Sequence, residues 1–177
     1  MVNKTNFENK NHSEITICEG CGLQLPMIND VCHSYMLSSP ACWKIYNEVL
    51  AREYGDNAYS SVNRLTVDSY ALQHPGTDDR RAIKSVNTHL ASLYLIFEKN
   101  HSYGEATAMM THIIEKHKVQ FTYLKPPKDL GNLTIYDVWK AKNAEEHIDI
   151  VKQWAKNVWD AWSEYHQYIA RLAVFKN

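Results

Sequence analysis

The stretch that decides the fold is Asn63–Gly76, which reads NRLTVDSYALQHPG. Apolar or small residues recur at helical spacing along it, so we expect a helix with one buried face, formed by Val62, Leu65, Ser69 and Leu72. The helix should end at His-Pro-Gly, because the residue before a proline is disfavoured in the helical region and glycine permits the turn. The same run also carries side chains that hold or move protons, namely Arg64, Asp68, Tyr70 and His74.

Helix signals on both sides of this stretch predict an all-α fold. Ser39 precedes Pro40, which suits an N-cap followed by proline in the first helical position. Periodic apolar seams then follow each start signal, and Gly and Pro are scarce. We therefore predict a helical bundle of about five helices with an N-terminal cysteine-rich zinc-knuckle segment. The expected helix starts are Ser39, Asn63, Thr77 or Asp78, Ser102, Thr134 for a short helix, and Asn143.

Length and composition indicate one globular domain. The 177 residues suit a single domain, which we place at 15–177, after a disordered leader at 1–14. A net charge of −1 and the lack of a basic patch argue against a nucleic-acid partner. No apolar run approaches a membrane span, and the N-terminus lacks the apolar core of a signal peptide. We therefore expect a cytoplasmic protein whose cysteines are thiols or metal ligands rather than disulfides.

The cysteines near the N-terminus predict a metal knuckle at 15–42. Cys18-Glu-Gly-Cys21-Gly places two thiolates within reach of one ion, and the glycine lets the backbone turn around it. Cys42 falls in the first turn of the expected helix, where the helix dipole favours a thiolate. The fourth ligand is Cys32 or His33, which spacing cannot separate, and we favour His33. The predicted metal is zinc. A thioredoxin-like redox pair would need a βαβ context, which is missing, and two unrelated structural cysteines are the plain alternative.

A second candidate site consists of three histidines and one acid. His74, His89 and His166 could converge if their helices are neighbours, with Asp68 accepting a ring N–H from His89 or His166. Such a set could activate water on a metal. The plainer interpretation is structural: Asp68 would pair with an arginine and the histidines would be hydrogen-bonded in the core. The candidate arginines for that pair are Arg64 and Arg52.

Several motifs in the sequence resemble those of a known family. CxxCG, SPxCW and RLTVDxYxxQHPG, followed by His-Leu, resemble a family of small, uncharacterised bacterial proteins classed as a domain of unknown function. The resemblance covers Cys18 to about Leu93 and supplies no reaction. The positions that match the pattern are Cys18, Cys21, Cys42, Asp68, Gln73, His74 and His89.

Two functions of different classes follow from these patterns. The first is a zinc-binding helical protein whose metal is structural, with a binding or scaffolding role toward an unknown protein or small-molecule partner. The alternative is a metal-dependent hydrolase or transferase with catalytic residues Asp68, His74, His89 and His166. Whether the protein is an enzyme stays open at this point.

Overall fold

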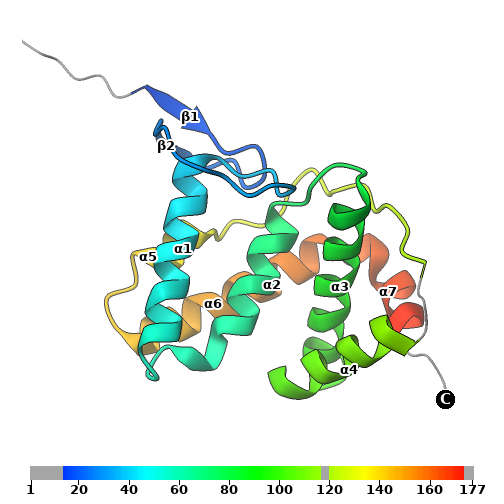
Figure 1. Cartoon of the computed structure of the whole chain (residues 1–177). Helices are drawn as coiled ribbons and strands as arrows, with labels where there is room; N and C mark the ends of the chain where they lie inside the picture. Colours follow the sequence, from blue (N-terminus) through cyan, green and yellow to red (C-terminus); the bar gives the residue numbers. More distant parts are fainter. Residues whose placement is uncertain (1–13, 117–119, 174–177) are drawn as a thin grey trace, which may run out of the picture.

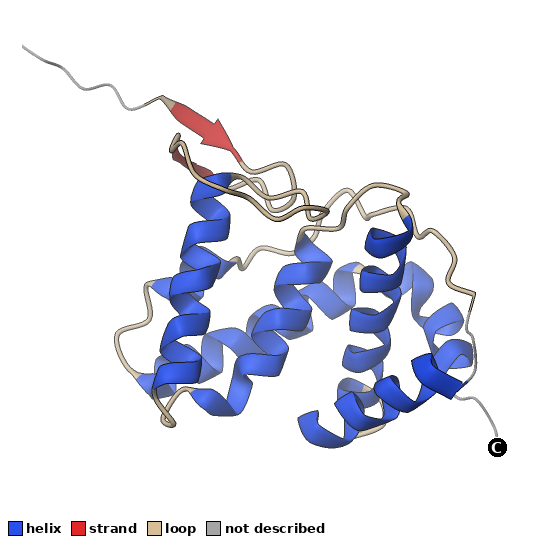
Figure 2. Cartoon of the chain, viewed as in Figure 1, coloured by secondary structure: helices blue, strands red, loops and turns tan. Residues whose placement is uncertain are grey.

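The chain begins with a small β-hairpin at one end of a helical body. The computed structural model describes residues 14–116 and 120–173. Strands β1 (Ile15–Ile17) and β2 (Gln24–Pro26) pair antiparallel, with Ile15 opposite Pro26. The hairpin lies above the N-terminal end of the first helix, and the rest of the described chain is helices and loops (Figure 2). The sequence did not predict this hairpin.

The described residues contain seven α-helices, so the prediction of a mostly helical fold is confirmed and the number of about five is wrong. They are α1 (Pro40–Gly55), α2 (Asn63–Gln73), α3 (Arg80–Phe97), α4 (Tyr103–Lys116), α5 (Ile135–Trp139), α6 (Ala144–Ala161) and α7 (His166–Ala173). Two 3₁₀ turns, Ser60–Val62 and Ser163–Tyr165, precede α2 and α7.

Most of the helices begin at the N-cap residues that the sequence predicted. The Ser39 hydroxyl accepts from the backbone N–H of Cys42, and Asn143 accepts from that of Glu146. The third helix differs, because its N-cap is Asp79, whose carboxylate accepts from two backbone N–H groups, rather than Thr77 or Asp78.

The last helix is divided, which accounts for part of the difference in helix number. Helix α6 ends at Ala161 with Trp162 as its C-cap, and a 3₁₀ turn leads into α7. The Trp162 side chain is fully buried, and its Nε1 donates to the carbonyl of Leu72, 3.3 Å away. The Trp159 carbonyl accepts from the Trp162 N–H at 3.1 Å and also from His166 Nε2 at 2.9 Å, so a side chain adds a donor where the helical pattern changes.

Helix α2 is the central element of the bundle. It lies between α1 and α3, with α6 crossing behind it (Figure 1), and it contacts all three. One buried face was predicted, but α2 is buried nearly all round, polar residues included. Its Gln73 amide donates to the carbonyls of Leu130 and Leu133 and accepts from Trp154 Nε1. These bonds satisfy a buried amide and attach a long loop to the core.

A buried acid and histidine also join three helices. Glu53 of α1 lies 2.8 Å from His147 Nε2 of α6, and it accepts from the Thr66 hydroxyl of α2 at 2.6 Å. All three side chains belong to residues with no exposed surface. This network fixes the angle between α1, α2 and α6 at the end of the bundle far from the hairpin (Figure 1).

None of the helices in the described part of the chain is long and apolar enough to cross a membrane. The predicted leader, 1–14, lies outside the described residues except for Glu14.

Candidate metal centre

Four potential metal ligands meet where the hairpin, α1 and α2 come together. Cys18 and Cys21 belong to the hairpin turn, Cys42 to the first turn of α1, and His74 follows the last residue of α2. One ligand atom from each residue lies within 4.8 Å of all the others. Within residues 14–116 and 120–173, no other set of three or more Cys, His, Asp and Glu is gathered in this way.

The turn of the hairpin directs both of its cysteines inward. The Cys18 N–H donates to the Leu23 carbonyl at 2.8 Å, and the Gly22 N–H donates to the Cys18 carbonyl at 2.8 Å. Gly22 has a φ of +74°, a left-handed conformation that glycine adopts without a steric cost. The tight turn therefore depends on the glycine that follows the CxxC pair.

Gly20 lets the turn lie directly against the end of α2. A Cβ added there would lie 2.5 Å from His74 Cδ2, 2.6 Å from the Leu37 carbonyl oxygen and 2.8 Å from that of Gln73. Two of these neighbours are backbone atoms, so they cannot move aside cheaply. A side chain at this position would push the two cysteines of the turn away from His74.

His74 presents one ring nitrogen to the sulfur atoms. Its Nδ1 donates to the Tyr70 carbonyl, 2.8 Å away, which leaves the lone pair of Nε2 free. Nε2 lies 3.4 Å from Cys42 Sγ. The imidazole also stacks on the Tyr70 ring, with centroids 3.9 Å apart. His74 is completely buried, so backbone, aromatic ring and sulfur together fix its orientation.

The three thiols differ in how firmly they hold their protons. Hydrogen bonds from Cys21 and Cys42 lower the pKa of Cys18 far below its ordinary value. The corresponding bond to Cys18 raises the pKa of Cys21 to about 12, and bonds to both other sulfurs, with burial, strongly raise that of Cys42. Cys18 is thus the sulfur that most readily accepts hydrogen bonds from the other two. A divalent cation would favour loss of the thiol protons, because metal ligands bind as thiolates.

The donor set and the spacing suit a metal ion. In a tetrahedral site with zinc–sulfur bonds of about 2.3 Å and zinc–nitrogen bonds of about 2.0 Å, ligand atoms lie about 3.5–3.8 Å apart. Cys21 Sγ and Cys42 Sγ are 3.8 Å apart, and Cys42 Sγ and His74 Nε2 are 3.4 Å apart. The four residues could therefore hold a metal with little movement.

The structure brings together three of the four predicted ligands. Cys18, Cys21 and Cys42 meet as the knuckle requires, but the fourth member of the group is His74 and not His33. His33 Nδ1 instead accepts from the backbone N–H groups of Tyr35 and Met36. The competing candidate, Cys32, is exposed. Sequence spacing favoured a nearby ligand, whereas the pattern QHPG already marked His74, which lies far along the chain.

The predicted catalytic set is not gathered in one place. His74 belongs to the cysteine group, and His89 lies 2.6 Å from Asp68 at the α2–α3 interface. His166 stacks on Trp159, with centroids 3.6 Å apart. The plainer interpretation fits these contacts better, since each histidine has its own partner in the core. Of the two candidate arginines, Arg64 approaches Asp68 at 3.8 Å.

Comparison with known proteins assigns the chain to a family. The model of a family of unknown function, DUF5946, matches residues 16–163, and the chain belongs to this family. No curated protein matches the chain, and no solved structure does. The match includes all four residues of the cysteine–histidine group.

The close approach at Gly20 leads to a testable prediction. Gly20→Ala is expected to lower the free energy of unfolding by about 1–3 kcal/mol, the usual cost of forcing atoms into a packed region. Chemical denaturation followed by circular dichroism measures the change. Gly55→Ala is the matched control, because a Cβ at Gly55 meets nothing within 4 Å. Equal stability of Gly20→Ala and Gly55→Ala would contradict the packing described for the turn.

Proposed function

We propose that this DUF5946 member is a zinc-binding protein in which a structural Cys₃His ion fixes the N-terminal hairpin to the helical bundle. The observation that carries the proposal is the convergence of Cys18, Cys21, Cys42 and His74 from three separate segments. Thiolate and imidazole ligands in a tetrahedral arrangement are typical of zinc. A short hairpin cannot form a hydrophobic core by itself, and the bonds to the ion would supply much of the stabilisation that such a core provides.

A structural role is supported by the number of side chains that could bind the ion and by their burial. Catalytic zinc sites keep a position open for water, whereas structural sites fill all four positions with side chains. Here four side chains are available, and Cys18, Cys42 and His74 are at most 1% exposed. A water-activating role would need one of them to leave. The geometry therefore favours the structural role over the metal-dependent hydrolase or transferase.

The surface of the hairpin region supports a binding role. Four of its large apolar side chains are exposed, namely Ile15, Ile17, Met27 and Val31, whereas Leu25 is buried against the bundle. Exposed apolar side chains grouped in one region indicate contact with another protein. We infer that zinc holds this surface in place for a protein partner. The four unpaired cysteines fit a reducing compartment, for which we propose the cytoplasm.

Metal content tests the ligand set. Protein purified without chelators is expected to contain one zinc per chain by elemental analysis, and Cys18→Ser and His74→Ala are expected to lose it because each removes a ligand. His74→Cys supplies a replacement ligand and is expected to keep zinc, which separates loss of binding from loss of folding.

Two matched variants complete that experiment. Cys32→Ser and His33→Ala remove the same residue types from the same region and are expected to retain one zinc. If His33→Ala lost the metal while His74→Ala kept it, the ligand set would be the one predicted from spacing. If the unaltered protein contained no metal, the proposal would fail.

Hydrogen exchange tests the structural role. Removing the metal with a chelator is expected to accelerate amide exchange in 15–42, because the turn loses its main attachment to α2. Exchange in α3 and α6, which pack around the core away from the hairpin, is expected to change little. Uniform acceleration across the chain would instead show that the metal supports the whole fold, and no change at all would argue against its attaching the hairpin.

A further inference from the structure

A second polar site lies on the other side of α2, away from the cysteine group. Asp68 of α2 is completely buried, and its Oδ1 accepts from His89 Nδ1 of α3 at 2.6 Å. Its Oδ2 accepts from the Ser92 hydroxyl at 2.7 Å, and Arg64 Nε lies 3.8 Å from Oδ1. The carboxylate is therefore held from three directions, and it fixes the orientation of the His89 ring.

The His89 residue also lines a cavity. Because Nδ1 donates to Asp68, the neutral imidazole carries its lone pair on Nε2. No hydrogen bond to Nε2 is formed by the described residues, and the His89 side chain is 14% exposed. The cavity measures about 310 Å³ and lies between α3, α4 and the loop that carries Tyr35. The wall of this cavity thus contains a histidine ring whose orientation is fixed by Asp68.

The cavity wall is cationic. Arg81 and Lys84, one helical turn apart on α3, line it together with His89. The Arg81 guanidinium lies over the Tyr35 ring, 5.6 Å from its centre, so its position is constrained. Among the described residues that line the cavity none is acidic, and Asp68 lies behind His89 with its oxygens already bonded. Such a wall attracts an anion.

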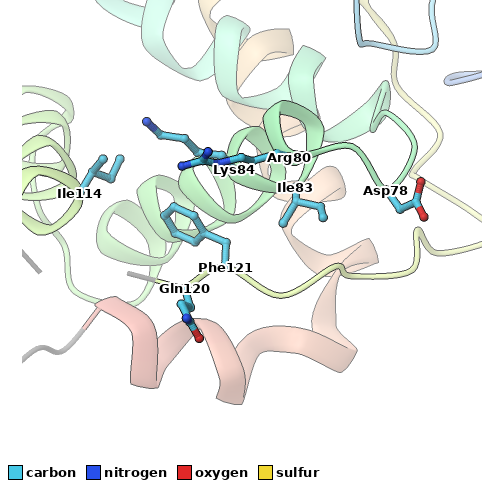
Figure 3. Close-up of a pocket in the computed structure, with 7 residues that line it drawn as sticks. All are labelled: Asp78, Arg80, Ile83, Lys84, Ile114, Gln120 and Phe121. Carbon is cyan, nitrogen blue, oxygen red and sulfur yellow. The ribbon is translucent and has the colours of Figure 1, made fainter. Parts of the chain in front are cut away.

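A larger cavity continues from the first one and gives room for the rest of a ligand. It measures about 720 Å³ and shares Lys84 and Ile114 with the smaller cavity. Figure 3 shows the Arg80 and Lys84 side chains extending from α3 in the same direction, with Ile114 of α4 facing them. Phe121 lies close to this pair, and Asp78 lies apart at the far side of the view. The larger cavity therefore combines the cations Arg80 and Lys84 with the apolar Ile83, Ile114 and Phe121, and its remaining lining residues are Gln120 and Asp78.

We infer that this groove between α3 and α4 binds a small organic phosphate. The phosphate would contact Arg81 and Lys84, and a hydroxyl of the ligand would donate to His89 Nε2, while the apolar part lies toward Ile114 and Phe121. Asp68 is a positioning residue, since it touches His89 and not the ligand. The inference does not depend on the metal, because neither His89 nor the two cations belong to the cysteine group.

An ion pair that only joins α2 to α3 would explain part of this arrangement. It would not require His89 to line a cavity, nor two cations beside it without an acidic partner in the wall. Burying a charged carboxylate is costly unless its partners are in place. Here the buried Asp68 carboxylate orients the His89 ring. A simple ion pair would not explain why the described residues form no hydrogen bond to the other nitrogen of that ring.

Nitrogen NMR of the histidine rings in the zinc-loaded protein tests the inference, with inorganic phosphate as the probe. The free protein is expected to carry the His89 proton on Nδ1, and addition of phosphate is expected to shift the Nε2 signal along a saturating curve. The variant Arg81→Ala/Lys84→Ala is expected to raise the dissociation constant at least about tenfold, since each charge-assisted hydrogen bond contributes roughly that factor or more. A His89→Gln sample assigns the signal.

The matched control removes two positive charges from an exposed face of α6, in Lys152→Ala/Lys156→Ala, and is expected to leave the dissociation constant unchanged. Three results would overturn the inference: a His89 proton on Nε2, a shift that does not saturate, or equal affinity in the two double variants. Because all samples carry zinc, a negative result here leaves the metal proposal intact.

Discussion

The contact between Cys42 at the start of α1 and His74 at the end of α2 is the constraint on which the N-terminal part of the structure depends. Their atoms are 3.4 Å apart, and the hairpin turn closes over them with Cys18 and Cys21. A three-residue strand pair has too little apolar surface to hold its position alone. Its outward face carries isoleucine, and Leu25 is the strand residue buried against the bundle, so the strands contribute only a small apolar contact. A cation shared by the four candidate ligands would add a further attachment, because its bonds would form only when all three segments are in place.

Helix α2 supports both candidate sites because it is buried and held by polar bonds. Its C-terminal end presents His74 to the cysteines, and its middle presents Asp68 to α3. Polar groups buried in this way are costly unless each has a partner. Gln73 and Asp68 meet that requirement through Trp154, His89 and other neighbours, so the helix cannot rotate without breaking several bonds. The cysteine–histidine group and the residues around Asp68 are thus fixed relative to one another.

Local sequence signals predicted most of the helices. Contacts between residues that are distant in sequence determined the features that were not predicted. N-cap serine and asparagine, and proline in the first helical position, predicted the starts of α1 and α6, because capping depends on residues that are neighbours in sequence. The division at Trp162 was not visible, since it depends on a side chain that reaches the backbone of α2. The three cysteines could be grouped from their spacing, but His74 could not be preferred to His33 without knowing that α2 ends beside the hairpin. The sequence predicted that Asp68 could accept a ring N–H from His89 or His166, and the structure shows that the partner is His89. The cavity beside this pair could not be predicted, because residues from separate elements line it.

X-ray absorption at the zinc edge measures the ligands of the metal directly, and so tests whether the ion joins the hairpin, α1 and α2. We expect a first shell of three sulfur atoms at about 2.3 Å and one nitrogen at about 2.0 Å, with the outer-shell scattering of one imidazole. We also expect His74→Cys to convert the shell to four sulfurs and His33→Ala to leave it unchanged. A four-sulfur shell in the unaltered protein, or an imidazole signal that disappears in His33→Ala, would contradict the arrangement described here.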